Sequence, residues 1–246
     1  MSDVTEDDLL DGRIRLRQPR AGYRAGLDAA LLAAACDAGP GERVIDVGCG
    51  VGGAMLAAAA RRPEARFVGF ERDARAAALA RENIALNGVG ARCEVVEGDV
   101  AAGFRALGLE PFHHALCNPP FFDDARELRA PSHAKSGAWM ADAGLAGWCA
   151  FLLKAVREGG TITVIHRADR LADLLGLLGD KAGSFRVRPI HPFADEAAKR
   201  VLVRAVKTGK APLALLPPLV LHAREGGAHT PLTEDILRGR GTLAWT

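Results

Sequence analysis

Short apolar, β-branched runs alternate with helical stretches over most of the chain, and this alternation limits the fold more than any other feature. Arg43–Gly48 and Arg66–Glu71 are predicted strands, and a helical pattern follows each of them. Such an order gives a parallel sheet with helices on both faces. Phe185–Ile190 and Lys199–Val206 come as two strands with no helix between them, which predicts an antiparallel pair at one edge. The sequence therefore predicts an α/β fold with a seven-stranded, mostly parallel sheet.

The other predicted elements complete this alternation. The remaining strands are Cys93–Glu97, Phe112–Cys117 and Thr161–His166, and the helices are Asp28–Cys36, Gly52–Arg62, Asp73–Asn87, a stripe from Leu145 to Ala155 that Gly159-Gly160 ends, and Ala168–Leu178. We expect a single domain over residues 1–246, with an N-terminal extension at 1–40 and a C-terminal packing segment at 207–246. Residues 122–144 lack a clear period, and loops of that length in compact domains are usually functional or disordered.

Composition excludes several classes of protein. Hydrophobic residues make up 49% of the chain, too many for a disordered protein. The longest strictly apolar run, Ala29–Cys36, is far shorter than a membrane span. The chain begins with acidic residues, unlike a secretory signal, and its five cysteines lack the spacing of a metal clip. We therefore expect a cytoplasmic protein with buried free cysteines, no metal and no membrane contact.

Charge is distributed unevenly along the chain. Residues 1–124 carry 14 basic and 19 acidic side chains, and residues 125–246 carry 18 and 11, so the two parts have net charges of −5 and +7. A basic C-terminal half suits a polyanionic partner, and it is equally compatible with a solvated surface.

A glycine-rich turn follows the first strand of the predicted core. It reads DVGCGVG and contains Asp46, Gly48, Gly50 and Gly52. Glycines allow a tight turn and a close approach of the backbone to a ligand. Glu71 ends the next strand, where a carboxylate can accept hydrogen bonds from a ribose, and Asp99 follows the third strand. The spacing differs from the dinucleotide fingerprint, and Asp46 would repel a diphosphate but suits a cationic amine.

Residues 46–52, Glu71 and Asp99 resemble the first three motifs of the class I S-adenosylmethionine-dependent methyltransferases, which have a Rossmann-like sheet. The resemblance implies S-adenosylmethionine as the cofactor. It also implies that the glycine turn holds the methionyl part, that Glu71 binds the ribose hydroxyls, and that Asp99 accepts from the adenine amino group beside Val100.

The fourth predicted strand ends in Asn118-Pro119-Pro120-Phe121, the most specific signal in the chain. The prolines remove two backbone donors and fix the backbone, so the side-chain and main-chain oxygens of Asn118 can both point at one planar amino group. Phe121 can lie flat against the ring that bears this amine. Two acceptors on the hydrogens of a delocalised amine favour the pyramidal form that attacks a methyl group. A sulfonium supplies the leaving group, so a strong general base is not required.

The tetrapeptide resembles the [DN]-P-P-[YFW] signature of amino-group methyltransferases. From about Arg13 to Trp245, the layout is similar to that of the bacterial adenine-N6 methyltransferases that act on valine tRNA. The resemblance implies that the catalytic residues are Asn118, Pro119, Pro120 and Phe121, with Asn118 also at the cofactor. It implies substrate contacts by Arg24, Asp28, Phe122, Arg126, Arg129 and Lys135. That family usually has tyrosine in place of Phe121 and threonine in place of Leu27.

Several substrates remain open at this point. Related N-P-P-F enzymes include guanine-N2 methyltransferases of ribosomal RNA, and others methylate a glutamine amide, usually with a separate helical N-terminal domain. Intact Asp46, Glu71 and Asn118 argue against an RNA-binding module without catalysis, and the glycine spacing argues against a dinucleotide oxidoreductase. The leading hypothesis is methyl transfer to the N6 amine of an adenine in RNA, with tRNA as the favoured RNA and an unknown oligomeric state.

Overall fold

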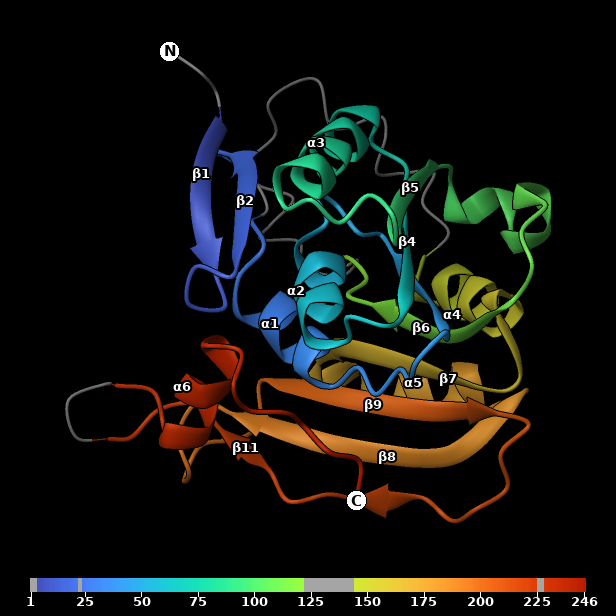
Figure 1. Cartoon of the computed structure of the whole chain (residues 1–246). Coiled ribbons are helices and arrows are strands. Elements are labelled where there is room, and N and C mark those ends of the chain that lie inside the picture. The colour runs from blue at the N-terminus through green and yellow to red at the C-terminus, as the bar shows by residue number, and fades with distance from the viewer. Residues whose placement is uncertain (1–3, 22–23, 122–143, 225–227) are drawn as a thin grey trace.

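A computed structural model of the chain describes residues 4–21, 24–121, 144–224 and 228–246. Its centre is a sheet in the order β5-β4-β3-β6-β7-β9-β8-β10, with β11 also paired to β8 (Figure 1). The strands are β3 (Arg43–Val47), β4 (Arg66–Glu71), β5 (Cys93–Glu97), β6 (Phe112–Cys117), β7 (Val156–Arg167), β8 (Ala182–His191), β9 (Arg200–Lys207), β10 (Ala214–Leu215) and β11 (Leu219–Val220).

The directions of the strands confirm the predicted mixed sheet. β3 to β7 pair in parallel, and β9 is antiparallel to both β7 and β8. β9 therefore lies between β7 and β8, so the predicted antiparallel pair forms with the later strand on the inside. Because β7 and β8 both oppose β9, the His191 end of β8 lies at the same edge of the sheet as the carboxyl ends of the parallel strands.

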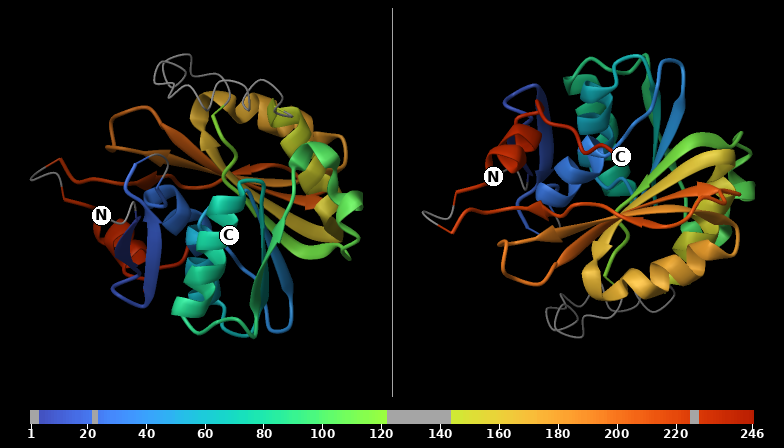
Figure 2. Two further views of the ribbon diagram at one scale, coloured as in Figure 1. Left: turned by 90° about the horizontal axis from the view of Figure 1, so that it is seen from above. Right: turned by 90° about the horizontal axis from the view of Figure 1, so that it is seen from below.

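Helices cover both faces of the sheet, as Figure 2 shows. One face packs on α1 (Leu27–Ala34), α2 (Gly53–Arg61) and α3 (Ala74–Leu86), and the other on α4 (Gly144–Ala155) and α5 (Leu171–Gly179), while α6 (Pro231–Leu237) packs on α1. Alternating strand residues divide the core: Val44 belongs to the α1–α2 side, and Ile45 and Val47 belong to the α4–α5 side. This is the alternation that a pleated strand imposes.

The N-terminal extension contains a hairpin that sequence analysis did not predict. β1 (Val4–Leu9) and β2 (Ile14–Pro19) are antiparallel. The side-chain amide of Asn83 accepts from the Arg17 amide at 2.8 Å and donates to the Arg17 carbonyl at 2.9 Å. Asn87 does the same to Arg15, at 2.9 and 2.7 Å. One turn of α3 thus holds the hairpin through two asparagines at i and i+4.

The predicted end of the fourth core helix is wrong. The helix α4 ends at Ala155, and β7 already begins at Val156, ahead of the glycine pair. The register between β6 and β7 shifts along this stretch, φ is +73° at Gly159, and a Cβ on Gly160 would lie 2.9 Å from the His113 carbonyl oxygen. The two glycines therefore permit an irregularity within a strand rather than ending a helix.

All five cysteines are free and buried, as expected. Within the described residues, no group of His, Cys, Asp or Glu side chains is placed to hold a metal ion. No helix in the same part of the chain is long and apolar enough to cross a membrane.

Candidate active site

The glycine turn after β3 has a left-handed backbone that glycine adopts without strain. The φ angle is +75° at Gly48, +55° at Gly50 and +88° at Gly52. The amides of Gly48 and Cys49 both donate to the Phe70 carbonyl, at 2.8 and 3.1 Å. These bonds tie the turn to the end of β4 and fix its position at the carboxyl edge of the sheet.

Glu71, at the end of β4, is positioned by backbone amides. Its Oε2 accepts from the Gly50 amide at 2.8 Å, and its Oε1 accepts from the amides of Arg72 and Asp73, each at 2.8 Å. A carboxylate has roughly four lone-pair positions. Three of them are taken, so Glu71 keeps acceptor capacity for the hydroxyl group of a ligand.

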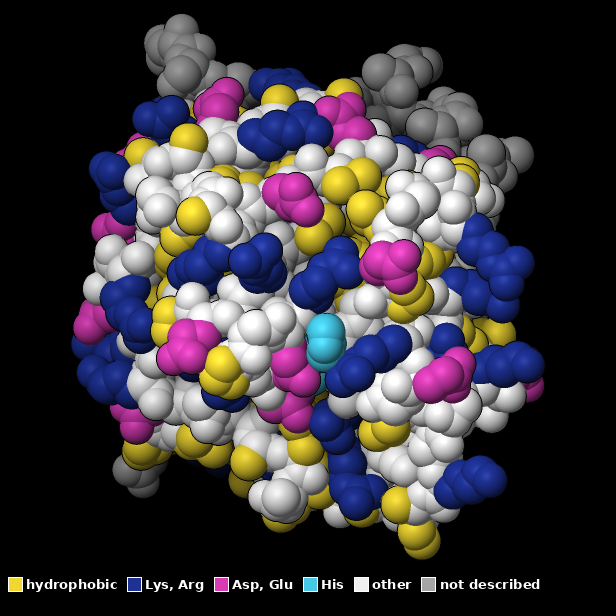
Figure 3. All heavy atoms as spheres, turned by 45° about the vertical axis from the view of Figure 1, so that its right-hand side comes forward, with side chains coloured by type: hydrophobic (Ala, Val, Ile, Leu, Met, Phe, Trp, Pro, Cys, Tyr) yellow, Lys and Arg dark blue, Asp and Glu magenta, His cyan; other side chains and the backbone are white. Residues whose placement is uncertain are grey.

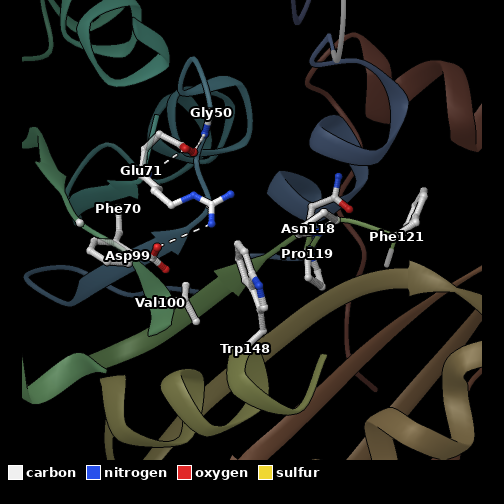
Figure 4. A pocket seen from close by; sticks show the side chains of 13 residues that line it. Gly50, Phe70, Glu71, Asp99, Val100, Asn118, Pro119, Phe121 and Trp148 are labelled. Atoms are coloured by element: carbon white, nitrogen blue, oxygen red, sulfur yellow. Dashed lines mark hydrogen bonds and ion pairs between the residues drawn. The ribbon is translucent and has the colours of Figure 1, made fainter. Parts of the chain in front are cut away.

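Asp99 follows β5 and faces Glu71 across a pocket. Its Oδ1 accepts from the Ala101 amide at 2.8 Å, and its Oδ2 lies 3.6 Å from Nη1 of Arg72. A dashed line at Asp99 in Figure 4 marks this ion pair. Both members of this ion pair are about half exposed, so the pair itself adds little stability. The buried Val100 lies beside Asp99.

The pocket has a volume of about 330 Å³ and joins the predicted cofactor residues to the tetrapeptide. Asn118 and Pro119 approach it from the end of β6, on the side away from Glu71 (Figure 4). Its lining residues are Gly48, Gly50, Phe70, Glu71, Arg72, Gly98, Asp99, Val100, Asn118, Pro119, Pro120, Phe121 and Trp148. The carboxyl ends of β3 to β6 therefore converge on one site, as open α/β sheets generally arrange their ligand sites.

Trp148 is a pocket residue that sequence analysis interpreted only as part of the α4 core stripe. A Cβ placed on Gly48 would lie 2.6 Å from Cη2 of Trp148, so the indole packs directly on the glycine turn. The side chain is 8% exposed, and its Nε1 is buried without a hydrogen-bond partner in the described structure. The spacing of Trp148 along the helix did not distinguish a pocket residue from a core residue, because large aromatic side chains also fill cores.

Asp46 lies beneath the glycine turn and is almost fully buried. Its Oδ2 has no hydrogen-bond partner in the described residues, and it lines a cavity of about 40 Å³ with Gly48 and Asn118. Burial raises the pKa of the Asp46 carboxyl to about 7; a hydrogen bond from the Met55 amide lowers this pKa, and the Glu71 carboxylate raises it. A cationic ligand group beside this oxygen would favour the ionised form.

These groups fit S-adenosylmethionine. Asp46 would face the methionyl ammonium, and Glu71 retains acceptor capacity for ribose hydroxyls. Phe70, Val100 and Trp148 line the pocket and would supply apolar walls for the adenine. No described residue of the pocket supplies the cluster of phosphate-binding cations that a dinucleotide would need, since the Arg72 guanidinium is paired with Asp99.

Phe121 extends away from the Glu71 end of the pocket (Figure 4). Its ring contacts His166, with centroids 5.2 Å apart, and the guanidinium carbon of Arg200 lies 4.9 Å above its centroid. Nε of Arg200 lies 3.2 Å from Oδ2 of Asp28, one of the predicted substrate residues. The structure thus brings Asp28 and Phe121 into one group with two residues that sequence analysis did not single out.

Arg24 is placed elsewhere. Its guanidinium donates to the Thr5 hydroxyl at 2.9 Å, the Pro19 carbonyl at 2.7 Å and the Asp7 carboxylate at 2.6 Å, and it does not line the pocket. Arg24 therefore links the two strands of the hairpin, β1 and β2, through its side chain. The predicted substrate contacts Phe122, Arg126, Arg129 and Lys135 lie outside the described residues. The substrate role of all five residues stays a prediction.

Comparison with solved structures identifies the class of protein. The fold matches a structure from Agrobacterium tumefaciens described as a predicted O-methyltransferase, with a TM-score of 0.73 and 31% identity over 88% of this chain and 98% of that one. Together with a pocket that fits the cofactor, this match defines a class I S-adenosylmethionine-dependent methyltransferase with a Rossmann-like sheet.

Sequence comparison supports the same class of protein. Residues 24–133 match the methyltransferase small domain family. A tRNA1(Val) (adenine(37)-N6)-methyltransferase of Bacteroides thetaiotaomicron is 32% identical over 75% of this chain and 77% of its own. The chain therefore belongs to the family of S-adenosylmethionine-dependent methyltransferases.

Other relatives match over shorter stretches. The enzyme of the same name from Shewanella amazonensis is 32% identical, and this chain spans 48% of its length. A release factor glutamine methyltransferase of Chlorobaculum tepidum is 28% identical over 64% of this chain and 56% of its own. The relatives thus include enzymes named for a nucleic-acid amine and for a protein amide.

Proposed function

We propose that the chain transfers a methyl group from S-adenosylmethionine to the exocyclic N6 amine of an adenine in RNA, with tRNA as the substrate. The observation that carries this proposal is the position of Asn118-Pro119-Pro120-Phe121. These residues line the same pocket as Glu71 and Asp99, so an amine held by the tetrapeptide would meet a cofactor held by the two carboxylates.

In this proposal, the tetrapeptide holds and orients the target amine. S-adenosylmethionine supplies an electrophilic methyl group when it is bound. The Asn118 side chain accepts a hydrogen bond from the target amine, and a main-chain oxygen freed by the prolines accepts a second. These two bonds orient the amine and withdraw its lone pair from the ring. Asn118 therefore acts where charge rearranges, and its contribution falls on the rate of transfer more than on binding.

Nitrogen is favoured over oxygen as the methyl acceptor. A hydroxyl substrate needs a base to remove its proton. No described residue that lines the pocket is a histidine or a lysine, and its two carboxylates, Glu71 and Asp99, lie away from the Asn118 side of the pocket. The Asn118 amide cannot remove a proton, so it suits an amine, whose nitrogen lone pair can attack the methyl group before a proton is lost. The name of the Agrobacterium tumefaciens structure refers to O-methyl transfer in that protein. The double proline after Asn118 supports an amine in this one.

Adenine-N6 is preferred over two other amines because of the relatives. Both the Bacteroides thetaiotaomicron and the Shewanella amazonensis enzymes are named for adenine-N6 in tRNA. A glutamine amide is the second candidate, supported by the release factor methyltransferase of Chlorobaculum tepidum. Guanine-N2 remains an alternative base because the tetrapeptide would hold either exocyclic amine in the same manner.

Surface charge is compatible with RNA but does not single it out. The face in Figure 3 carries many Lys and Arg side chains, with Asp and Glu side chains among them. Over the described residues as a whole, many basic side chains form ion pairs, including Arg167 with Asp169 and Arg224 with Asp195. RNA affinity should therefore depend on a few well-placed cations rather than on one continuous basic field.

A direct assay tests the proposal. The protein is incubated with radiolabelled S-adenosylmethionine and, in separate reactions, an unmodified valine tRNA transcript, ribosomal RNA, duplex DNA and a release factor. Labelled nucleosides are then identified by digestion and chromatography. N6-methyladenosine from the tRNA is the expected product. Label only in N2-methylguanosine, or only in the release factor, would replace the proposal with the corresponding alternative.

A further inference from the structure

Four segments that are distant in sequence form a group around Phe121, in which His166 and Arg200 contact the ring and Asp28 contacts Arg200. Phe121 follows β6, His166 lies near the end of β7, Arg200 begins β9, and Asp28 lies in the first turn of α1. The His166 ring meets the Phe121 ring at 62° with a centroid distance of 5.2 Å. The Arg200 guanidinium lies over the same ring at 4.9 Å, within the range of a cation–π contact. Phe121 is thus held from two directions.

The Arg200 guanidinium is oriented by two hydrogen bonds and keeps further donors. Its Nε donates to Oδ2 of Asp28 at 3.2 Å, and its Nη1 donates to the Lys199 carbonyl at 3.2 Å. In the described part of the chain, its Nη2 makes no hydrogen bond. The Arg200 side chain has 33% of its surface exposed. A guanidinium carries five N–H groups in a fixed plane, so the unused edge is a prepared donor for an anion.

His166 supports the ring without adding charge. It is 3% exposed, and burial lowers its pKa to about 4, with Arg167 and Arg200 acting in the same direction and Asp169 and Asp173 opposing. Its Nδ1 accepts from the Arg167 amide at 2.8 Å, so the proton of the neutral ring is on Nε2. The positive charge beside Phe121 is therefore that of Arg200.

We propose that Arg200 binds a backbone phosphate next to the nucleotide whose base enters the pocket, so that this site accepts a nucleic-acid strand in preference to a protein side chain. The inference rests on the proposed function, because Phe121 marks the place of the target base. A phosphodiester supplies a backbone anion next to every base, whereas the backbone of a peptide bearing a glutamine is uncharged. Asp28 holds Nε and leaves the opposite edge of Arg200 for the phosphate oxygens.

The test compares Arg200→Gln with Arg43→Gln. Arg43 is a matched control, because its guanidinium also lies over a phenylalanine ring, Phe112, at 4.4 Å, but at the amino end of its strand. Steady-state methyl transfer to an unmodified valine tRNA transcript is measured for wild type and both variants over a range of salt. Cofactor-dependent thermal shifts are recorded in parallel.

Arg200→Gln should raise the KM for tRNA by about 10- to 100-fold, the range of one charge-assisted hydrogen bond. It should leave kcat within about two-fold, since a uniform binding contact acts on KM. It should reduce the salt slope of binding by about one. Arg43→Gln should match wild type in all three. Equal KM values for the two variants would overturn the inference, and so would an unchanged salt slope.

A second measurement needs no variant and covers the case in which Arg200→Gln fails to fold. Anticodon stem-loops are made with a single uncharged methylphosphonate at each linkage around the target adenosine. Wild-type enzyme should lose about 10-fold or more in KM at one linkage only. A uniform response at every linkage would exclude a specific phosphate contact. If wild type methylates no RNA at all, the proposed function fails first; if it methylates RNA without this pattern, only the role of Arg200 fails.

Discussion

The cofactor end of the pocket is built mainly from backbone groups, whereas the substrate end is built from side chains of separate segments. Three backbone amides position Glu71, and two more join the glycine turn to β4. Phe121, by contrast, is held by His166 and Arg200. Backbone contacts do not change with substitution elsewhere, while side-chain contacts do. The cofactor end can therefore stay constant while the substrate end changes from one relative to another.

The largest effect should come from the residue at the junction of the two ends. Asn118→Ala should slow methyl transfer by about 100- to 1,000-fold, the cost of one preorganised hydrogen bond at a reacting group. Its cofactor-dependent thermal shift should persist, because the glycine turn and Glu71 are unchanged. Single-turnover transfer and thermal shift measure the two properties. Asn118→Asp, which keeps an acceptor, is the control and should be less impaired. A wild-type rate for Asn118→Ala would mean that the tetrapeptide only stiffens the end of the strand and takes no part in methyl transfer.

Glu71 tests the cofactor end alone. Glu71→Ala should weaken S-adenosylmethionine binding by about 10- to 100-fold, since it removes a charged acceptor and releases the Gly50 amide. Isothermal titration calorimetry measures this change. The exposed Glu94 on β5 is the matched control, and Glu94→Ala should bind as wild type does. Equal affinity for the two variants would mean that the cofactor does not contact Glu71.

Phe121 tests the substrate end alone. Phe121→Ala should raise the KM for RNA by about 5- to 100-fold through lost base stacking, and should leave cofactor affinity unchanged. Phe121→Tyr should retain most activity, because the stacking face is kept and the related adenine enzymes usually have tyrosine there. A fall in cofactor affinity for Phe121→Ala would show that the two ends are coupled and would weaken the comparison between them.

The smallest effect should be a pH dependence at Asp46. Burial raises its pKa from 3.8 to about 7, so the folded protein without ligand loses stability as pH rises from the lower value through the higher. A cationic cofactor prefers the carboxylate, so its affinity should rise up to about 10-fold from about pH 6 to about pH 8. Binding near neutral pH should release a proton, detected by calorimetry in buffers of different ionisation enthalpy. Asp46→Asn should remove both effects; if the slope persists in that variant, another group titrates.

Local sequence determined the parts of the site that could be predicted. The glycine turn, Glu71, Asp99 and the tetrapeptide each lie at the end of a strand, so one alternating pattern placed them all at one edge. The pairing of Arg200 with Asp28 joins residues far apart in the chain, and no periodicity encodes it. The pocket role of Trp148 could not be predicted for a different reason: residues of a pocket wall and residues of a core stripe have the same spacing on a helix. Single-domain organisation and cytoplasmic location stay predictions.

The hairpin was missed although its sequence carried a signal. Ile14 and Leu16 alternate with exposed or partly exposed residues, and Asp11-Gly12 forms part of the turn, with φ of +60° and +78°. A short apolar alternation next to a turn dipeptide predicts a hairpin. The acidic composition of β1 concealed it, because only its partner strand contributes strongly to the core.

The two asparagines that hold this hairpin also protect it. A strand at the edge of a sheet presents unpaired amides and carbonyls to which another chain can add. On the outer edge of β2, the side-chain amides of Asn83 and Asn87 occupy the donors and acceptors of Arg17 and Arg15 that such a strand would use. A helix thereby ends a sheet by imitating the hydrogen bonding of a third strand. The two-stranded sheet cannot be extended there by another molecule, and edge-to-edge aggregation is blocked at this point.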